Sequence, residues 1–160
     1  MENENRLYKI LPVCAAILLT LGFIFGHSAM SRSASLSESS AVAGWLMKLL
    51  RLESVDPDRL VGIVRKLAHF AEFALLGGET SLLLRAIGRP VSFLRGGFSL
   101  LCCLLAAVCD ETVQIFSGRG PGIVDVWIDF AGAFFGFFLL LGLSGLLRKK
   151  ARRVLTKQDK

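Results

Sequence analysis

The sequence is poor in the polar and charged residues that a soluble domain of its size needs. Charged residues make up 20% of the 160 residues, and hydrophobic residues make up 53%. The mean hydropathy is +0.58. A soluble chain of this length would need far more polar surface to cover its core. The composition therefore excludes an ordinary soluble domain and predicts one small membrane unit.

The sequence also lacks a disulfide framework and a cysteine-based metal motif. Its four cysteines lie inside apolar runs, where a free cysteine behaves as a small hydrophobic side chain. The adjacent Cys102 and Cys103 point to different faces of a helix, so they are poor partners for a bridge. No Cys/His spacing typical of a metal site accompanies them. We expect the cysteines to pack against protein or lipid.

Four apolar segments reach or approach the length of about 20 residues that a helix needs to cross a bilayer. They cover approximately residues 7–25, 60–87, 93–116 and 123–147. The second is the least apolar, because it contains Arg65, His69 and Glu79, and it is credible only as a helix that faces protein or water on one side. We expect an all-α, polytopic membrane protein with four transmembrane helices in a single domain, residues 1–147.

The first segment also has features of a secretory signal peptide. Arg6 and Lys9 precede its apolar core, and small residues follow at Gly26, Ser28 and Ala29. Its apolar run is long for a signal peptide, and the rest of the chain predicts further membrane helices. We therefore favour an uncleaved helix.

Serines dominate the start of the connection between the first two segments and predict a flexible or turn-rich stretch. They are Ser28, Ser31, Ser33, Ser35, Ser37, Ser39 and Ser40. After them, Val42, Trp45, Leu46 and Leu49 recur at helical spacing. This pattern predicts a short amphipathic helix that lies in the outer membrane interface, with the tryptophan at headgroup depth.

Arginine and lysine in short loops predict how the chain crosses the membrane. The connection after the second segment contains Arg85, Arg89 and Arg95 and no acid, whereas the next connection contains one arginine, Arg119. A basic tail, residues 148–160, favours the anionic cytoplasmic leaflet over nucleic acid as its partner. We expect both termini in the cytoplasm, and the first and third connections outside.

Ionisable residues on three segments fall at one predicted depth, in the outer half of the membrane. Charged groups in membrane helices are costly and normally mark function. Asp110 and Gln114 are four residues apart, as are Asp125 and Asp129, so each pair lies on one helical face. The candidate catalytic residues are His69, Glu72, Asp110 and Glu111, and the candidate ligand-binding residues are Lys66, Gln114, Arg119, Asp125 and Asp129.

Several chemistries fit these residues. His69 and Glu72 can form a general acid–base pair, or an interhelical hydrogen-bonded pair that only fixes packing. The acids can also hold Mg²⁺ or Ca²⁺ through oxygen ligands. No two of them sit in a recognised metal motif, so we expect no metal or other cofactor, with a divalent cation as the alternative. The spacing does not decide whether Asp110 or Glu111 faces the site.

Glycines mark two further features. Three of them surround Arg119 in the third connection, where a carboxylate or phosphate could approach the backbone and accept two hydrogen bonds from the guanidinium. Gly132 and Gly136 are four residues apart on the fourth segment. A stripe of small residues at this spacing is typical of close helix packing.

The polar residues and glycines together resemble the VanZ-like membrane proteins. The pattern is Lys66-x-x-His69, Asp110-Glu111-x-x-Gln114-x-x-x-Gly118-Arg119, Asp125 and Gly132-x-x-x-Gly136. The resemblance implies a bacterial cell-envelope protein of the cytoplasmic membrane, in a family whose namesake is linked to resistance to teicoplanin. It also implies that the polar residues form one site. Phe73 stands where the family pattern has tyrosine, and Asp129 stands where it has asparagine.

Three classes of function remain open. A binding protein would recognise a glycopeptide antibiotic or a lipid-linked cell-wall precursor at the outer leaflet. A membrane-embedded hydrolase or transferase would act on lipid headgroups or lipid-linked glycans, with His69 as base and Glu72 as its orienting group. A transporter is least favoured, because four spans show no obvious inverted repeat. We expect membrane lipids as partners and no nucleic acid; the sequence does not determine the oligomeric state or whether the protein is an enzyme.

Overall fold

Within the residues that the structure describes, the chain forms five α-helices and no strand. The structure is a computed structural model, and it describes residues 2–51, 55–88, 91–118 and 122–158. The helices are α1 (Glu2–Ser28), α2 (Arg32–Leu50), α3 (Pro57–Ala86), α4 (Phe93–Phe116) and α5 (Ile123–Gln158). The predicted all-α class is therefore confirmed.

Among the described residues, α1, α4 and α5 are long and apolar enough to cross a membrane. Their apolar stretches are Arg6–Ser28, Phe93–Phe116 and Ile123–Leu147, and 18-residue windows within them have mean hydropathies of 2.1, 1.7 and 2.1. α3 has 30 residues, but His69, Glu72 and Glu79 make it less apolar than the other three. Length and composition thus support three of the four predicted membrane helices, and the crossing of α3 stays a prediction.

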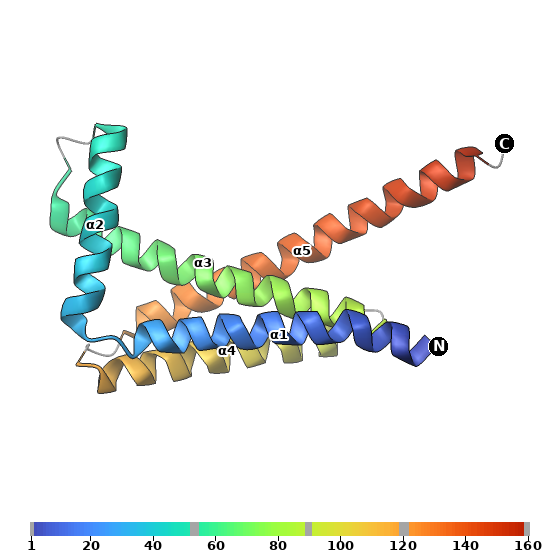
Figure 1. The fold of residues 1–160 in the computed structure, drawn as a ribbon, viewed down its shortest axis with the longest axis horizontal. Helices are drawn as coiled ribbons and strands as arrows, with labels where there is room; N and C mark the ends of the chain where they lie inside the picture. Colours follow the sequence, from blue (N-terminus) through green and yellow to red (C-terminus); the bar gives the residue numbers. More distant parts are fainter. Residues whose placement is uncertain (1, 52–54, 89–90, 119–121, 159–160) are drawn as a thin grey trace.

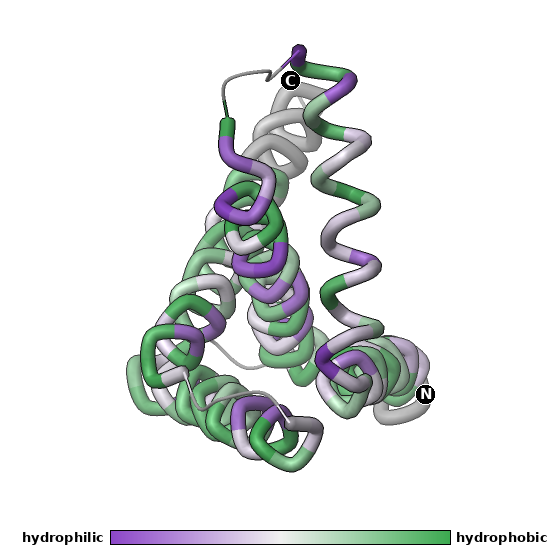
Figure 2. Tube along the Cα trace, turned by 90° about the vertical axis from the view of Figure 1, so that its left-hand side faces the viewer, coloured by the Kyte–Doolittle hydropathy of each residue, from purple (hydrophilic) through white to green (hydrophobic). Residues whose placement is uncertain are grey.

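The two ends of the bundle differ (Figure 1). Both chain termini lie at one end, where α3 also ends and α4 begins. At the opposite end α1 and α4 end, α3 and α5 begin, and α2 lies across the bundle. We call this the polar end; it is marked by Ser28, Pro57, Phe116 and Ile123. Seen from this end, hydrophilic residues recur along α3 in the middle of the view, whereas the other bundle helices are mostly hydrophobic (Figure 2).

α3 contacts each of the other four helices, and its closest packing is against α5. Gly132 and Gly136 of α5 lie against the backbone carbonyl groups of Phe70 and Ala74, and Gly77 of α3 lies against that of Ala133. A Cβ atom at any of these glycines would overlap the carbonyl oxygen that it faces. The predicted close packing at Gly132 and Gly136 is confirmed, and it sets how α5 lies on α3.

The buried core of the bundle is small. Its centre contains Ile24 of α1, Phe73 of α3, and Cys103 and Ala107 of α4. Large side chains on the outer faces of the helices, such as those of Leu18, Phe98, Trp127 and Phe135, are exposed in the single chain. Lipid would cover these apolar faces, since a soluble monomer rarely leaves so much apolar surface in water. All four cysteines are free, and Cys103 packs in the core.

α2 differs from its prediction. The serine-rich stretch expected to be flexible is helical, because α2 begins at Arg32 and contains the serines from Ser33 to Ser40. Ser31 caps the helix by accepting a hydrogen bond from the Ala34 N–H at 3.4 Å. Ser40 donates to the Leu36 carbonyl at 2.7 Å, so its hydroxyl is satisfied inside the helix. The predicted amphipathic helix is therefore only the second half of a 19-residue element.

The other helices are longer than the predicted segments. α1 begins before residue 7, and α5 continues beyond Leu147, through most of the predicted basic tail, to Gln158. α3 begins at Pro57, where Asp56 caps the helix by accepting a hydrogen bond from the Asp58 N–H. A proline is favourable in this first position, because its missing N–H would have no partner in the helix. Hydropathy marks only the apolar part of each helix, which explains these differences.

Candidate functional site

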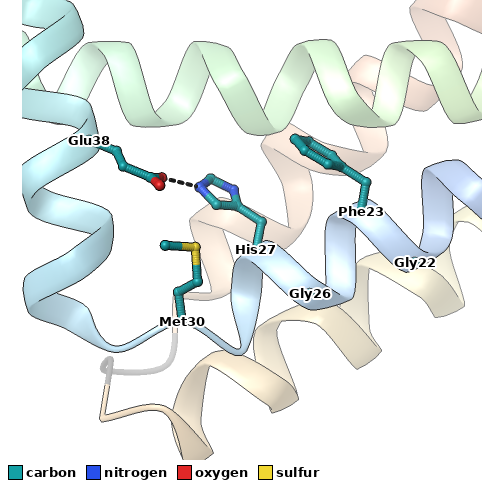
Figure 3. A pocket seen from close by; sticks show the side chains of 6 residues that line it. All are labelled: Gly22, Phe23, Gly26, His27, Met30 and Glu38. Carbon is teal, nitrogen blue, oxygen red and sulfur yellow. Dashed lines mark hydrogen bonds and ion pairs between the residues drawn. The ribbon is translucent and has the colours of Figure 1, made fainter.

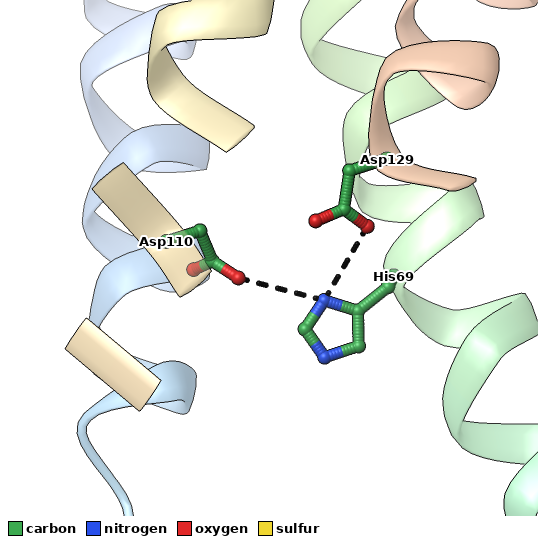
Figure 4. Close-up of side chains that lie close together, drawn as sticks. All are labelled: His69, Asp110 and Asp129. Atoms are coloured by element: carbon green, nitrogen blue, oxygen red, sulfur yellow. Dashed lines mark ion pairs between the residues drawn. The ribbon is translucent and has the colours of Figure 1, made fainter. Parts of the chain in front are cut away.

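Three side chains from three helices meet inside the bundle near the polar end (Figure 4). His69 Nδ1 of α3 lies 3.6 Å from Asp110 Oδ2 of α4 and 3.6 Å from Asp129 Oδ1 of α5. The His69 side chain is 7% exposed, and the two aspartate side chains are 0% exposed. We call these three residues the buried cluster. Because water is excluded, its charges have to be balanced within the site.

Close packing of α3 against α5 places Asp129 in the buried cluster. Gly132 lies against the backbone of Phe70, the residue that follows His69. Asp129 precedes Gly132 by three residues and therefore lies on the same face of α5. A side chain at position 132 would hold the two helices apart and move Asp129 away from His69.

A stripe of buried residues on α4 places Asp110. Cys103, Ala107, Asp110 and Gln114 recur at helical spacing, and all four are buried. Gln114 Nε2 donates a hydrogen bond to Asp110 Oδ2 at 2.8 Å. The prediction that Asp110 and Gln114 share a face is confirmed, and the bond orients the carboxylate beside His69.

Glu111 and its neighbour Asp110 have different partners. This answers the question that the sequence left open, which of the two carboxylates faces the site. Glu111 Oε2 accepts a hydrogen bond of 2.8 Å from the backbone N–H of Gly122, just before α5. Its side chain is buried. Asp110 thus faces the buried cluster, whereas Glu111 ties the end of α4 to the start of α5.

Two of the remaining predicted residues, Asp125 and Lys66, lie outside the buried cluster. Asp125 Oδ2 lies 3.9 Å from an Arg65 guanidinium nitrogen, and both side chains are partly exposed. Lys66 is exposed. Arg119, predicted to contact an anion, lies outside the residues that the structure describes.

Glu72 is placed between the buried cluster and α2. Its Oε1 atom lies 3.5 Å from His27 Nδ1 of α1, and His27 Nε2 lies 3.1 Å from Glu38 Oε2 of α2. His27 and Glu38 also line an open pocket of about 400 Å³ between α1 and α2, shown in Figure 3. The other lining residues are Gly22, Phe23, Gly26 and Met30. The pocket therefore combines apolar walls with two ionisable groups.

Three polar residues near these sites were not predicted from the sequence. They are Thr20, His27 and Glu38. Thr20 Oγ1 of α1 donates a hydrogen bond to Glu79 Oε1 of α3 at 2.9 Å, which supplies the partner of a buried carboxylate. Each of the three pairs with a residue far along the chain or on another helix, so no local spacing reveals it. The one available signal was that His27 is ionisable and lies just after the first apolar segment, at its predicted outer end.

The buried cluster supports two kinds of chemistry. A histidine between two carboxylates can gain or release a proton, with the carboxylates orienting the ring and stabilising its charged form. The same three residues can each offer one ligand atom to a metal ion, because those atoms lie within 4.8 Å of one another.

Comparison with known proteins gives one result that bears on identity. The VanZ/LLP1 family model matches residues 13–147, which include all five helices in whole or in part. Comparisons with curated proteins and with solved structures find no significant match. The buried cluster, the pocket residues and the packing glycines all fall within the matched region. With most of its length matched, the chain belongs to the VanZ/LLP1 family.

Proposed function

We propose that this membrane protein binds the polar group of a lipid-linked or amphiphilic ligand at its polar end, and that this binding lowers susceptibility to teicoplanin. The observation that carries the proposal is the gathering of ionisable residues from all five described helices at one end of an otherwise apolar bundle. These residues are His27, Glu38, Arg65, His69, Glu72, Asp110, Asp125 and Asp129.

The pocket between α1 and α2 supports an amphiphilic ligand in particular. Phe23 and Met30 offer apolar contacts, while His27 and Glu38 offer hydrogen-bonding groups within the same pocket. Trp45 and Leu49 of α2 are exposed at this end, where aromatic and aliphatic side chains can enter the headgroup region. A ligand with one apolar and one polar part matches this arrangement. We place the polar end at the outer leaflet of the bacterial cytoplasmic membrane, following the charges of the loops.

The pocket residue Glu38 offers a direct test. Glu38→Gln should weaken the binding of fluorescent teicoplanin to proteoliposomes by about tenfold, because one charge-assisted hydrogen bond contributes about 1.5–3 kcal/mol. The same variant, expressed in a susceptible bacterium, should lose protection at equal membrane abundance.

Lys48→Gln is the matched control, because it removes a charge from an exposed position on the same helix but outside the pocket. Equal binding by wild type, Glu38→Gln and Lys48→Gln, or no binding by the wild type, would rule the proposal out.

A membrane-embedded hydrolase or transferase is the second candidate, favoured by the position of His69 between Asp110 and Asp129. It would act on lipid headgroups or lipid-linked glycans, with His69 as acid–base group. The structure pairs Glu72 with His27, so the orienting groups in this version are the two aspartates. His69→Gln should then abolish turnover of a lipid-linked substrate while leaving teicoplanin binding in the pocket unchanged. A binding protein would show no turnover in either form.

A further inference from the structure

We infer that His69, Asp110 and Asp129 form a binding site for one divalent transition-metal ion, with Zn²⁺ as the best fit. One ligand atom from each residue lies within 4.8 Å of the other two. The ligands come from α3, α4 and α5, so the folded bundle assembles them from distant parts of the chain (Figure 4). The inference concerns the residues on which the second candidate function rests, but metal content can be measured without ligand, antibiotic or substrate.

The two distances to His69 lie closer to the spacing of tetrahedral zinc than to that of octahedral Mg²⁺. Bonds of about 2.0–2.1 Å in a tetrahedron place neighbouring ligand atoms about 3.3–3.4 Å apart. His69 Nδ1 lies 3.6 Å from each of the two aspartate oxygens, slightly more than this spacing, and the ligand atoms of the two aspartates lie within 4.8 Å of one another. Neighbouring ligands of octahedral Mg²⁺ lie closer, about 2.9 Å apart. An imidazole with two carboxylates also suits zinc better than Mg²⁺ or Ca²⁺, which prefer oxygen ligands alone.

The charge of the buried cluster provides a second argument. If both aspartates ionise beside a neutral histidine, the cluster carries a charge of −2, and neither aspartate side chain has exposed surface. The ion pairs that the structure describes for Asp110 and Asp129 are both with His69, whereas Arg65 pairs with Asp125. Burying uncompensated charge is very costly. One divalent cation would reduce the net charge to zero.

Missing hydrogen bonds to the carboxylates of Asp110 and Asp129 also support a bound cation. Asp110 Oδ1 and both carboxylate oxygens of Asp129 accept no hydrogen bond from any residue that the structure describes, although both side chains are fully buried. Buried acceptors without a donor are rare, and each normally has a specific explanation. A metal ion would supply one for Asp129 Oδ1, the donor-less oxygen that lies 3.6 Å from His69 Nδ1. Gln114 Nε2 bonds to Asp110 Oδ2, as outer groups do when they orient a metal ligand.

Metal content of the purified full-length chain tests this inference. The protein would carry a tag without histidine, be loaded with Zn²⁺, and be washed with a weak chelator before elemental analysis in detergent. We expect one Zn²⁺ per wild-type chain. Asp129→Asn keeps the size of the side chain but removes its charge, so it should weaken Zn²⁺ binding by at least about tenfold, the lower bound for loss of an outer-shell partner.

Asp125→Asn is the matched control, because it removes the acid one helical turn away that pairs with Arg65. It should keep the wild-type Zn²⁺ content. Wild-type protein without bound Zn²⁺ would overturn the inference, as would equal loss of Zn²⁺ from Asp125→Asn and Asp129→Asn.

Co²⁺ substitution keeps the inference testable if Asp129→Asn does not fold. Wild-type protein loaded with Co²⁺ should show the intense visible absorption of a tetrahedral nitrogen–oxygen site. Thiolate-to-cobalt charge-transfer bands would instead place the ion at the cysteines and overturn the assignment. Neither result depends on teicoplanin binding, so failure of the metal site and failure of the proposed function are separate outcomes.

Discussion

At the scale of single residues, neighbours in the sequence have different roles in the structure. Asp110 faces His69 inside the bundle, whereas Glu111 accepts a hydrogen bond from Gly122 at the start of α5. The separation follows from the helix, in which consecutive side chains diverge by about 100°. Both carboxylates are buried, so each has to be stabilised by its own partners.

The bond between Gln114 and Asp110 gives a prediction about stability. Gln114→Leu removes the donor that Asp110 Oδ2 uses and should lower the free energy of unfolding by about 1–3 kcal/mol, the usual cost of a buried acceptor that loses its donor. Thermal unfolding in detergent would measure the change. Thr112→Val is the control, because the Thr112 hydroxyl is exposed and, among the described residues, bonds only to the Val108 carbonyl of its own helix. A melting temperature unchanged by Gln114→Leu would contradict this role of the bond.

At the scale of elements, contact between α3 and α5 positions the site. Gly132 and Gly136 let the two backbones touch, and Asp129 lies one turn from Gly132 on the same face. The sequence correctly predicted this packing from two glycines four residues apart. It did not indicate which helix the two glycines would contact, because a stripe of small residues on one helix carries no information about its partner helix.

A larger side chain at this contact should therefore destabilise the protein. Gly136→Leu places atoms where the Ala74 carbonyl lies and should cost about 1–3 kcal/mol or more, since overpacking forces the helices apart. Gly142→Leu is the matched control on the same helix, because nothing lies within 4 Å of a Cβ at Gly142. Membrane abundance and thermal unfolding in detergent would compare the two. Equal stability of both variants would contradict the packing role.

α2 is the element that the sequence predicted least well. Serine has a modest helix propensity and often occurs in turns, so a run of serines predicts a flexible stretch. In the structure this stretch is helical, and contacts with other helices support it: α2 packs on α3, and Glu38 of α2 lies 3.1 Å from His27 of α1. Tertiary packing supplies most of the stability of a helix of this kind, and it is not visible in the local sequence.

At the scale of the whole molecule, both chain termini lie at one end of the bundle (Figure 1), and the buried cluster lies nearer the other, the polar end. The arrangement is compatible with an even number of crossings, including one by α3. The loop charges predict that the termini face the cytoplasm, which would place the polar end outside.

Cysteine labelling would test this orientation. In a chain whose native cysteines are replaced by alanine, Ser37→Cys on α2 should react in intact cells with a maleimide that cannot cross the membrane. Ser92→Cys, before α4, should react only after the cells are permeabilised; both positions are exposed in the structure. Labelling of Ser92→Cys alone in intact cells would reverse the orientation and place the polar end in the cytoplasm.

The sequence by itself determined the features that depend on neighbours along the chain. The apolar segments, the helical class, and the shared face of Asp110 and Gln114 all follow from helix length and periodicity, which are local properties. The family pattern also pointed to the correct family. Only the tertiary structure decided that His69 meets Asp110 and Asp129 while Glu72 meets His27. Those distances depend on how each helix is rotated and how closely it approaches its neighbours, and contacts between distant glycines and carbonyl groups set both.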